Sequence, residues 1–142
     1  ADVVVFIDHD LSWRAKDLLT LIETEGDVAA GIYRFKKTLE TEEYMGVLDD
    51  VNGAVQVRAD GCLKATRVPA GFLKITKEGV NRFMTHYPEL TYGPKYNLSV
   101  DLFNHGAHKG AWWGEDYAFS RNWLAMGGDL WIIPDISCHH KS

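Results

Sequence analysis

The chain has 142 residues, and its 46% hydrophobic and 25% charged residues are typical of one globular domain. Its formal net charge is −5 and its lysines and arginines are scattered, which argues against a nucleic acid or an anionic membrane surface as the partner. No apolar stretch approaches the length of a membrane span and no signal peptide precedes the first strand, so we expect a cytoplasmic protein with no membrane span. The two cysteines, Cys62 and Cys138, could pair or stay free.

The first predicted element is a buried strand over residues 3–7, because an unbroken β-branched and aromatic run needs apolar neighbours on both faces. Asp8 and Asp10 follow it, one residue apart. Groups beyond the carboxyl end of a strand line the ligand crevice of an α/β sheet. Two carboxylates there suit Mg²⁺ or Mn²⁺, which hold phosphate oxygens, whereas a turn or a helix cap is the purely structural alternative.

Short apolar runs predict the remaining strands. They are expected over residues 27–33, 44–48, 54–58, 62–68, 72–75, 100–104 and 129–133. Gly31, inside the first of these runs, indicates a close approach within the sheet. Polar segments predict loops over residues 37–43, 89–97 and 105–110, and Pro134 and Asp135 predict a turn before the terminal segment. The loop 105–110 is either a mobile lid over a site or a solvated surface loop.

Helical spacing of apolar residues predicts three helices, over residues 13–25, 76–86 and 112–126. Their expected N-caps are Ser12 and Thr76, and their expected stops are Gly26, Pro88 and Gly127. The third helix opens with Glu115 and Asp116, which its dipole favours by ~0.3–1 kcal/mol each. If these carboxylates face a cleft, one of them could instead take a proton from an acceptor hydroxyl.

The order of these motifs resembles that of the metal-dependent GT-A glycosyltransferases, over nearly the whole chain. The motifs concerned are Asp8-His9-Asp10 after the first strand, Val28-Ala29-Ala30-Gly31, Gly71-Phe72, Gly114-Glu115-Asp116-Tyr117, Gly127-Gly128, and Pro134-Asp135-Ile136 with His140. In that family the Asp-x-Asp motif ends a central strand and binds Mn²⁺ or Mg²⁺ carrying a nucleoside-diphosphate sugar. A Glu-Asp pair opens an acceptor-side helix, and a C-terminal histidine completes the metal shell.

The resemblance implies roles for individual residues. Asp8, Asp10 and His140 look like the metal ligands, with His139 as the alternative after a one-residue shift. Asp116 looks like the catalytic base, with Glu115 second. The residues that would contact the sugars are Gly71, Phe72, Trp113 and Tyr117.

The fold class we expect is therefore α/β, as a single GT-A-like domain over residues 1–142 with a mixed, mainly parallel central sheet flanked by helices. It is truncated relative to that family, whose members begin with a nucleotide-binding half before the Asp-x-Asp strand. Either the chain is a fragment, or it is a minimal version that binds nucleotide weakly, or a second chain, such as the other copy in a homodimer, supplies the missing half.

The expected function is transfer of a sugar from a UDP- or GDP-linked donor to a glycan or other hydroxyl acceptor, with Mn²⁺ or Mg²⁺. Two other classes stay open. Residues 7–11 partly match the motif of haloacid-dehalogenase phosphohydrolases, although Leu11 stands where that motif has Thr or Val. The chain could also be a non-catalytic module that binds a sugar or a nucleotide.

Overall fold

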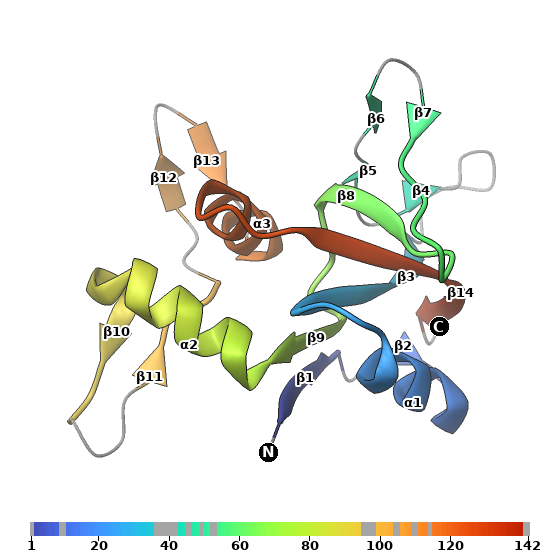
Figure 1. Ribbon diagram of the computed structural model, residues 1–142, viewed down its shortest axis with the longest axis horizontal. Coiled ribbons are helices and arrows are strands. Elements are labelled where there is room, and N and C mark those ends of the chain that lie inside the picture. The colour runs from blue at the N-terminus through green and yellow to red at the C-terminus, as the bar shows by residue number, and fades with distance from the viewer. Residues whose placement is uncertain are drawn as a thin grey trace.

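Strands from both ends of the chain build one central sheet. The computed structural model (Figure 1) describes residues 2–8, 11–35, 43–44, 47–48, 50–51, 54–94, 99–103, 106–108, 111–113 and 115–140. The strands of the central sheet are β1 (Val3–Ile7), β2 (Leu11–Ser12), β3 (Val28–Phe35), β4 (Glu43–Tyr44), β5 (Val47–Leu48), β8 (Leu63–Arg67), β9 (Phe72–Thr76) and β14 (Leu130–His140).

Shorter strands pair with one another outside this sheet. They are β6 (Asp50–Val51) with β7 (Ala54–Val55), β10 (Thr91–Tyr92) with β11 (Ser99–Val100), and β12 (Gly106–His108) with β13 (Ala111–Trp113). The helices are α1 (Ala15–Glu23), α2 (Lys77–His86), the 3₁₀ helix η1 (Pro88–Leu90) and α3 (Glu115–Ala125). Among the described residues, no helix is both long and apolar enough to cross a membrane.

The protein has a mixed α/β fold, as expected, but the expectation of a mainly parallel sheet is wrong. The strand order is β1-β9-β3-β14-β8-β5, with β2 also paired to β14 and β4 to β3. Of these pairs in the described chain, β14 and β3 are parallel and the others are antiparallel. An apolar run indicates that both faces of a strand are covered, but it carries no information on strand direction. Here β9 enters between β1 and β3 and runs antiparallel to both.

Helices cover both faces of the sheet. Neighbouring residues of one strand face opposite sides, and here they belong to two different core clusters. The cluster beside α1 contains Leu21, Ala29, Phe72, Ile133 and Ile136. The cluster beside α2 and α3 contains Ala30, Leu73, Ile132, Phe83, Phe119 and Trp123. The described residues of β3 and β9 are thus buried on both faces of the sheet. The strand predicted over residues 3–7 is present as β1, but the expectation that both of its faces are buried is wrong, because β1 lies at the end of the strand order and Val4 is 41% exposed.

Two of the predicted helix starts are wrong, and the reasons are local. Ser12 lies in β2 opposite His139, and α1 begins at Ala15 after Arg14. The Asp17 carboxylate accepts a hydrogen bond from the Arg14 backbone N–H at 3.1 Å, so the helix start is fixed from inside the first turn. The third helix begins at Glu115, because residues 111–113 form a strand.

The start of α2 is confirmed. The Thr76 side-chain oxygen accepts a hydrogen bond from the Gly79 backbone N–H at 3.0 Å, which satisfies one of the donors at the helix N-terminus. Two predicted loops contain regular structure instead. Residues 106–108 form β12, whereas residues 105, 109 and 110 lie outside the described part, and η1 and β10 occupy residues 88–92.

The last strand is longer than predicted. The sequence indicates a strand over 129–133 followed by a turn at Pro134 and Asp135, but β14 continues to His140. The register of its pairing with β3 shifts between Ile133 and Ser137, so an irregularity accommodates the proline within a continuous strand. As a result the end of the chain reaches β2, beside α1 (Figure 1).

Gly31 lies in close contact with its neighbours, as predicted. The closest neighbours, however, are side chains and not backbone atoms. A Cβ atom at this position would lie 2.6 Å from Ile136 Cγ2 and 3.1 Å from Phe72 Cδ2. Both neighbouring side chains are buried, with exposed fractions of 1% and 0%, so neither has room to move away.

We predict that Gly31→Ala lowers the free energy of unfolding by about 1–3 kcal/mol, because it overpacks this contact. The measurement is chemical denaturation of both proteins. In an Ile136→Ala background the same substitution should lower the free energy of unfolding by clearly less, since the nearest clashing atom is absent. An equal decrease in both backgrounds would contradict the packing explanation.

Candidate functional site

Asp8 lies at the surface where β1 ends. Its backbone N–H donates a hydrogen bond to the Gly71 carbonyl at 2.8 Å, just beyond the last pair of the β1–β9 ladder, Ile7 with Phe72. The Asp8 side chain is exposed. Asp8 and Gly71, which the sequence separates widely, are therefore adjacent at one edge of the sheet.

The end of the chain returns to the same region. In the antiparallel β14–β2 pair, His139 lies opposite Ser12 and His140 lies opposite Leu11. Cα atoms of such partners are roughly 4.5–5.5 Å apart. Asp10 and the side chains of both histidines lie outside what the structure describes. The observation is that the backbone at His140 lies beside Leu11, the residue that follows Asp10 in the sequence.

The chemistry of this donor set fits a divalent cation. The two carboxylates supply the hard oxygen ligands that Mn²⁺ and Mg²⁺ prefer, and the imidazole nitrogen suits Mn²⁺ better than Mg²⁺. Among side chains that the structure describes, no group of three or more His, Cys, Asp or Glu residues gathers. Asp8 is the one proposed ligand whose side chain is described, so the backbone register is the observation that bears on this site.

The middle of α3 is tied to the segment between β8 and β9, which contains Gly71. The Ser120 hydroxyl oxygen accepts a hydrogen bond from the Val68 backbone N–H at 3.1 Å, and Ser120 is fully buried. The three residues from Val68 to Gly71 can span at most about 11 Å, and Gly71 accepts from Asp8. Position 116 precedes Ser120 by one helical turn on the same face. The side chains of Glu115 and Asp116 are not among those described.

The residues expected to contact sugars differ in their surroundings. Phe72 is fully buried, and its ring centroid lies 6.0 Å from that of Trp13, so its side chain is part of the core beside α1. Tyr117 is half-buried, and the Arg67 guanidinium lies over its ring, 4.2 Å from the centroid. Position 113 pairs with Gly106 in the β12–β13 hairpin, and the Trp113 side chain lies outside the described set.

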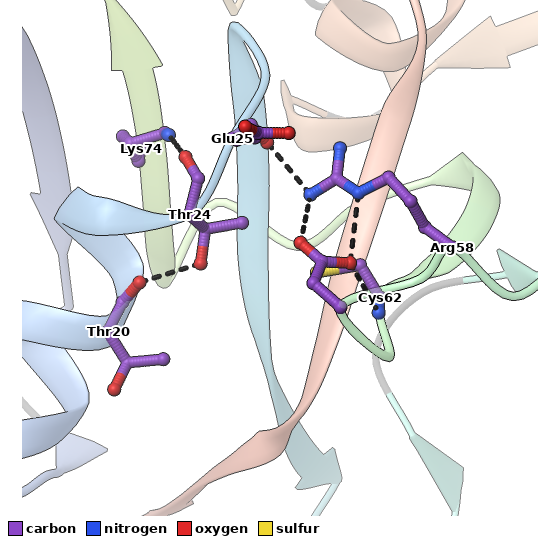
Figure 2. Close-up of polar contacts among 7 residues, drawn as sticks. Thr20, Thr24, Glu25, Arg58, Cys62 and Lys74 are labelled. Atoms are coloured by element: carbon purple, nitrogen blue, oxygen red, sulfur yellow. Dashed lines mark hydrogen bonds and ion pairs between the residues drawn. The ribbon is translucent and has the colours of Figure 1, made fainter.

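A polar pocket that the sequence did not indicate lies between the end of α1, the turn before β8, and β14. Its volume is about 520 Å³, and Figure 2 shows its central side chains. Arg58 donates to both carboxylate oxygens of Asp60, at 2.9 and 2.7 Å, and to the Glu25 carbonyl at 2.9 Å. The hydrogen bond to Asp60 raises the pKa of Arg58, and the same bond holds the pKa of Asp60 far below its usual value.

Two buried residues complete this cluster. Lys74 Nζ donates to the Thr24 carbonyl at the C-terminus of α1, where a cation is favoured by the helix dipole (Figure 2). Burial lowers the pKa of Lys74, and the charge of Arg58 lowers it further. Burial raises the pKa of the Cys62 thiol, and so does its neighbour Asp60. Each polar group here has a partner within the protein, so the cluster joins α1 to the sheet.

The structure resolves the question of Cys62, which is a buried free thiol and not half of a disulfide. We predict that native Cys62 reacts with iodoacetamide at least about tenfold more slowly than the same residue in denaturant, because it is buried and its thiolate is disfavoured. A Cys138→Ser variant, in which Cys62 is the one thiol left, allows the rate to be read by mass spectrometry. Equal rates in the native and denatured protein would contradict this environment.

The fold has a relative among solved structures. No protein-family model matches this chain, and neither does any curated protein. A structure described as A197 from STIV aligns with 100% of this chain and 59% of its own, with a TM-score of 0.51 and 16% sequence identity. The chain thus spans 59% of the length of that protein. At this identity the likeness shows a shared fold and nothing about activity.

Proposed function

We propose that this chain is the metal-binding and acceptor-binding part of a GT-A-type glycosyltransferase. It would take a nucleoside-diphosphate sugar, UDP- or GDP-linked, and a glycan or other hydroxyl acceptor. The observation that carries the proposal is the pairing of His140 with Leu11, next to Asp10 in the chain. The hydrogen bond from Asp8 to Gly71 supports it, because it joins the first proposed ligand to the turn on the acceptor side.

In this proposal Asp8, Asp10 and His140 hold the divalent cation. When bound, the cation neutralises negative charge that builds up on the departing diphosphate. Asp116 accepts the proton of the acceptor hydroxyl as its oxygen attacks the anomeric carbon and the bond to the diphosphate breaks. Attack from the side opposite the leaving group inverts the anomeric configuration. The link from Val68 to Ser120 supports the role of Asp116, since it ties α3 to the segment leading into Gly71.

We predict that Asp10→Ala and His140→Ala each abolish Mn²⁺-dependent binding of a nucleoside diphosphate, measured by calorimetry with UDP and GDP. Each removes a ligand from a small donor set. His86→Ala, an exposed histidine in the last turn of α2, is the matched control and should bind like the wild type. If Asp10→Ala loses Mn²⁺-dependent binding and His140→Ala keeps it, the result would instead favour a dehalogenase-like site. Such a site uses the two aspartates without a C-terminal histidine.

We predict that Asp116→Asn lowers the turnover number by at least about 10²-fold, the usual contribution of a general base, while donor affinity changes little. The measurement is sugar transfer, or donor hydrolysis to water when no acceptor is present. Asp129→Asn, just beyond the other end of α3 and mostly exposed, is the matched control. If Asp116→Asn keeps most of the turnover, this residue is not the base.

A further inference from the structure

β1 lies at one end of the strand order, and within the described part of the chain β9 is its only strand partner. It is the dark blue strand beside the N-terminus in Figure 1. The strand is apolar throughout, and one carboxylate precedes it and another follows it, Asp2 and Asp8. β1 is therefore an edge strand with no charged side chain between its ends.

The free side of β1 presents a row of backbone groups. Successive residues of an antiparallel strand direct their N–H and C=O groups to opposite sides. The Asp8 N–H donates to the Gly71 carbonyl at 2.8 Å, and the Lys77 N–H donates to the Asp2 carbonyl at 2.9 Å, so the even-numbered residues bond towards β9. The odd-numbered residues direct these groups to the opposite side, which no described strand occupies. They are Val3, Val5 and Ile7.

β1 lacks the features that usually protect an edge strand. Short length, a lysine, a proline or a bulge normally prevents pairing with another chain. β5, at the other end of the strand order, is two residues long, and its pairing with β8 is irregular. β1 is five residues long, keeps one register with β9 and contains neither lysine nor proline, and Val4 in its middle is exposed. The β1 edge thus has the properties of an interaction surface.

Charge distinguishes between the possible partners of this edge. Asp2 and Asp8 are both exposed, and neither forms an ion pair with another described residue. If a second copy of β1 paired antiparallel along the full strand, each Asp2 would lie opposite the partner's Asp8. Like charges directly opposite each other in a sheet are destabilising, whereas opposite charges are favourable. A strand with a basic residue at each end therefore complements this edge better than a second copy does.

We propose that the free edge of β1 binds an extended segment of another polypeptide, apolar in its middle and with lysine or arginine at both ends. The segment joins the sheet as a further strand, with hydrogen bonds to the outward-facing groups of Val3, Val5 and Ile7. Its apolar side chains cover Val4, and its basic ends lie beside the two carboxylates. The interaction goes beyond the proposed function and requires neither metal nor nucleotide.

The probe is the peptide Lys-Thr-Val-Thr-Val-Thr-Lys with blocked ends, which matches positions 2–8 in length. A second peptide carries glutamate in place of both lysines, and a third carries proline at its centre. The measurement is an NMR titration of the labelled chain at low ionic strength and without divalent cations. The lysine peptide should shift the signals of β1 and bind at least about fivefold more tightly than the glutamate peptide. The proline peptide, which lacks the central N–H, should bind more weakly than the lysine peptide.

Two variants of the chain test the edge and its charges separately. Val4→Lys should weaken binding of the lysine peptide at least about fivefold, because it places a positive charge on the edge. Asp2→Lys leaves the apolar edge intact and should bring the affinities for the lysine and glutamate peptides closer together. The matched control is Val57→Lys, at an exposed valine outside β1, which should bind like the wild type.

Three results would overturn the inference. The first is that the wild type does not bind the lysine peptide, or binds the lysine and glutamate peptides equally. The second is equal binding of the lysine peptide by the wild type and Val4→Lys. The third is a wild type that sediments as a dimer without peptide and becomes monomeric on Val4→Lys, because a second copy would then occupy the edge.

Discussion

The pairing of β14 with three other strands is the constraint on which the rest of the structure depends. It pairs with β8 on one side, with β3 on the other, and with β2 near its end. The first two pairings complete the sheet between two helical layers. The third places the end of β14 beside β2, near the beginning of the chain. The register shift between Ile133 and Ser137 allows one strand to serve all three partners. The third pairing is the contact that places His140 beside Leu11.

Much of the fold could be predicted because local physics determines it. The apolar runs of β1 and β9 and the Thr76 cap of α2 each depend on residues that are close in sequence. Strand direction and order could not be predicted, because they depend on which distant strands pair. The full length of β14 could not be predicted for the same reason. Pro134 alone predicts a turn, but β14 pairs with β3 both before and after this residue, so the strand continues through it.

For the candidate site, the sequence supplied residue types and the fold supplied proximity. Asp8 with Gly71, and His140 with Leu11, are adjacent only through strand pairing. The Arg58 cluster could not be predicted from the sequence, because Lys74 lies in an otherwise apolar strand and contacts the end of α1 only after folding.

The proposed cation site lies between the end of β1 and the end of β14, and paramagnetic broadening of assigned backbone amide NMR signals by substoichiometric Mn²⁺ would locate it. If Mn²⁺ binds there, the signals of Asp8, Leu11 and His140 broaden first, while those of α2 stay sharp. Broadening centred on the acidic residues around Asp60, or spread evenly over the surface, would rule this site out.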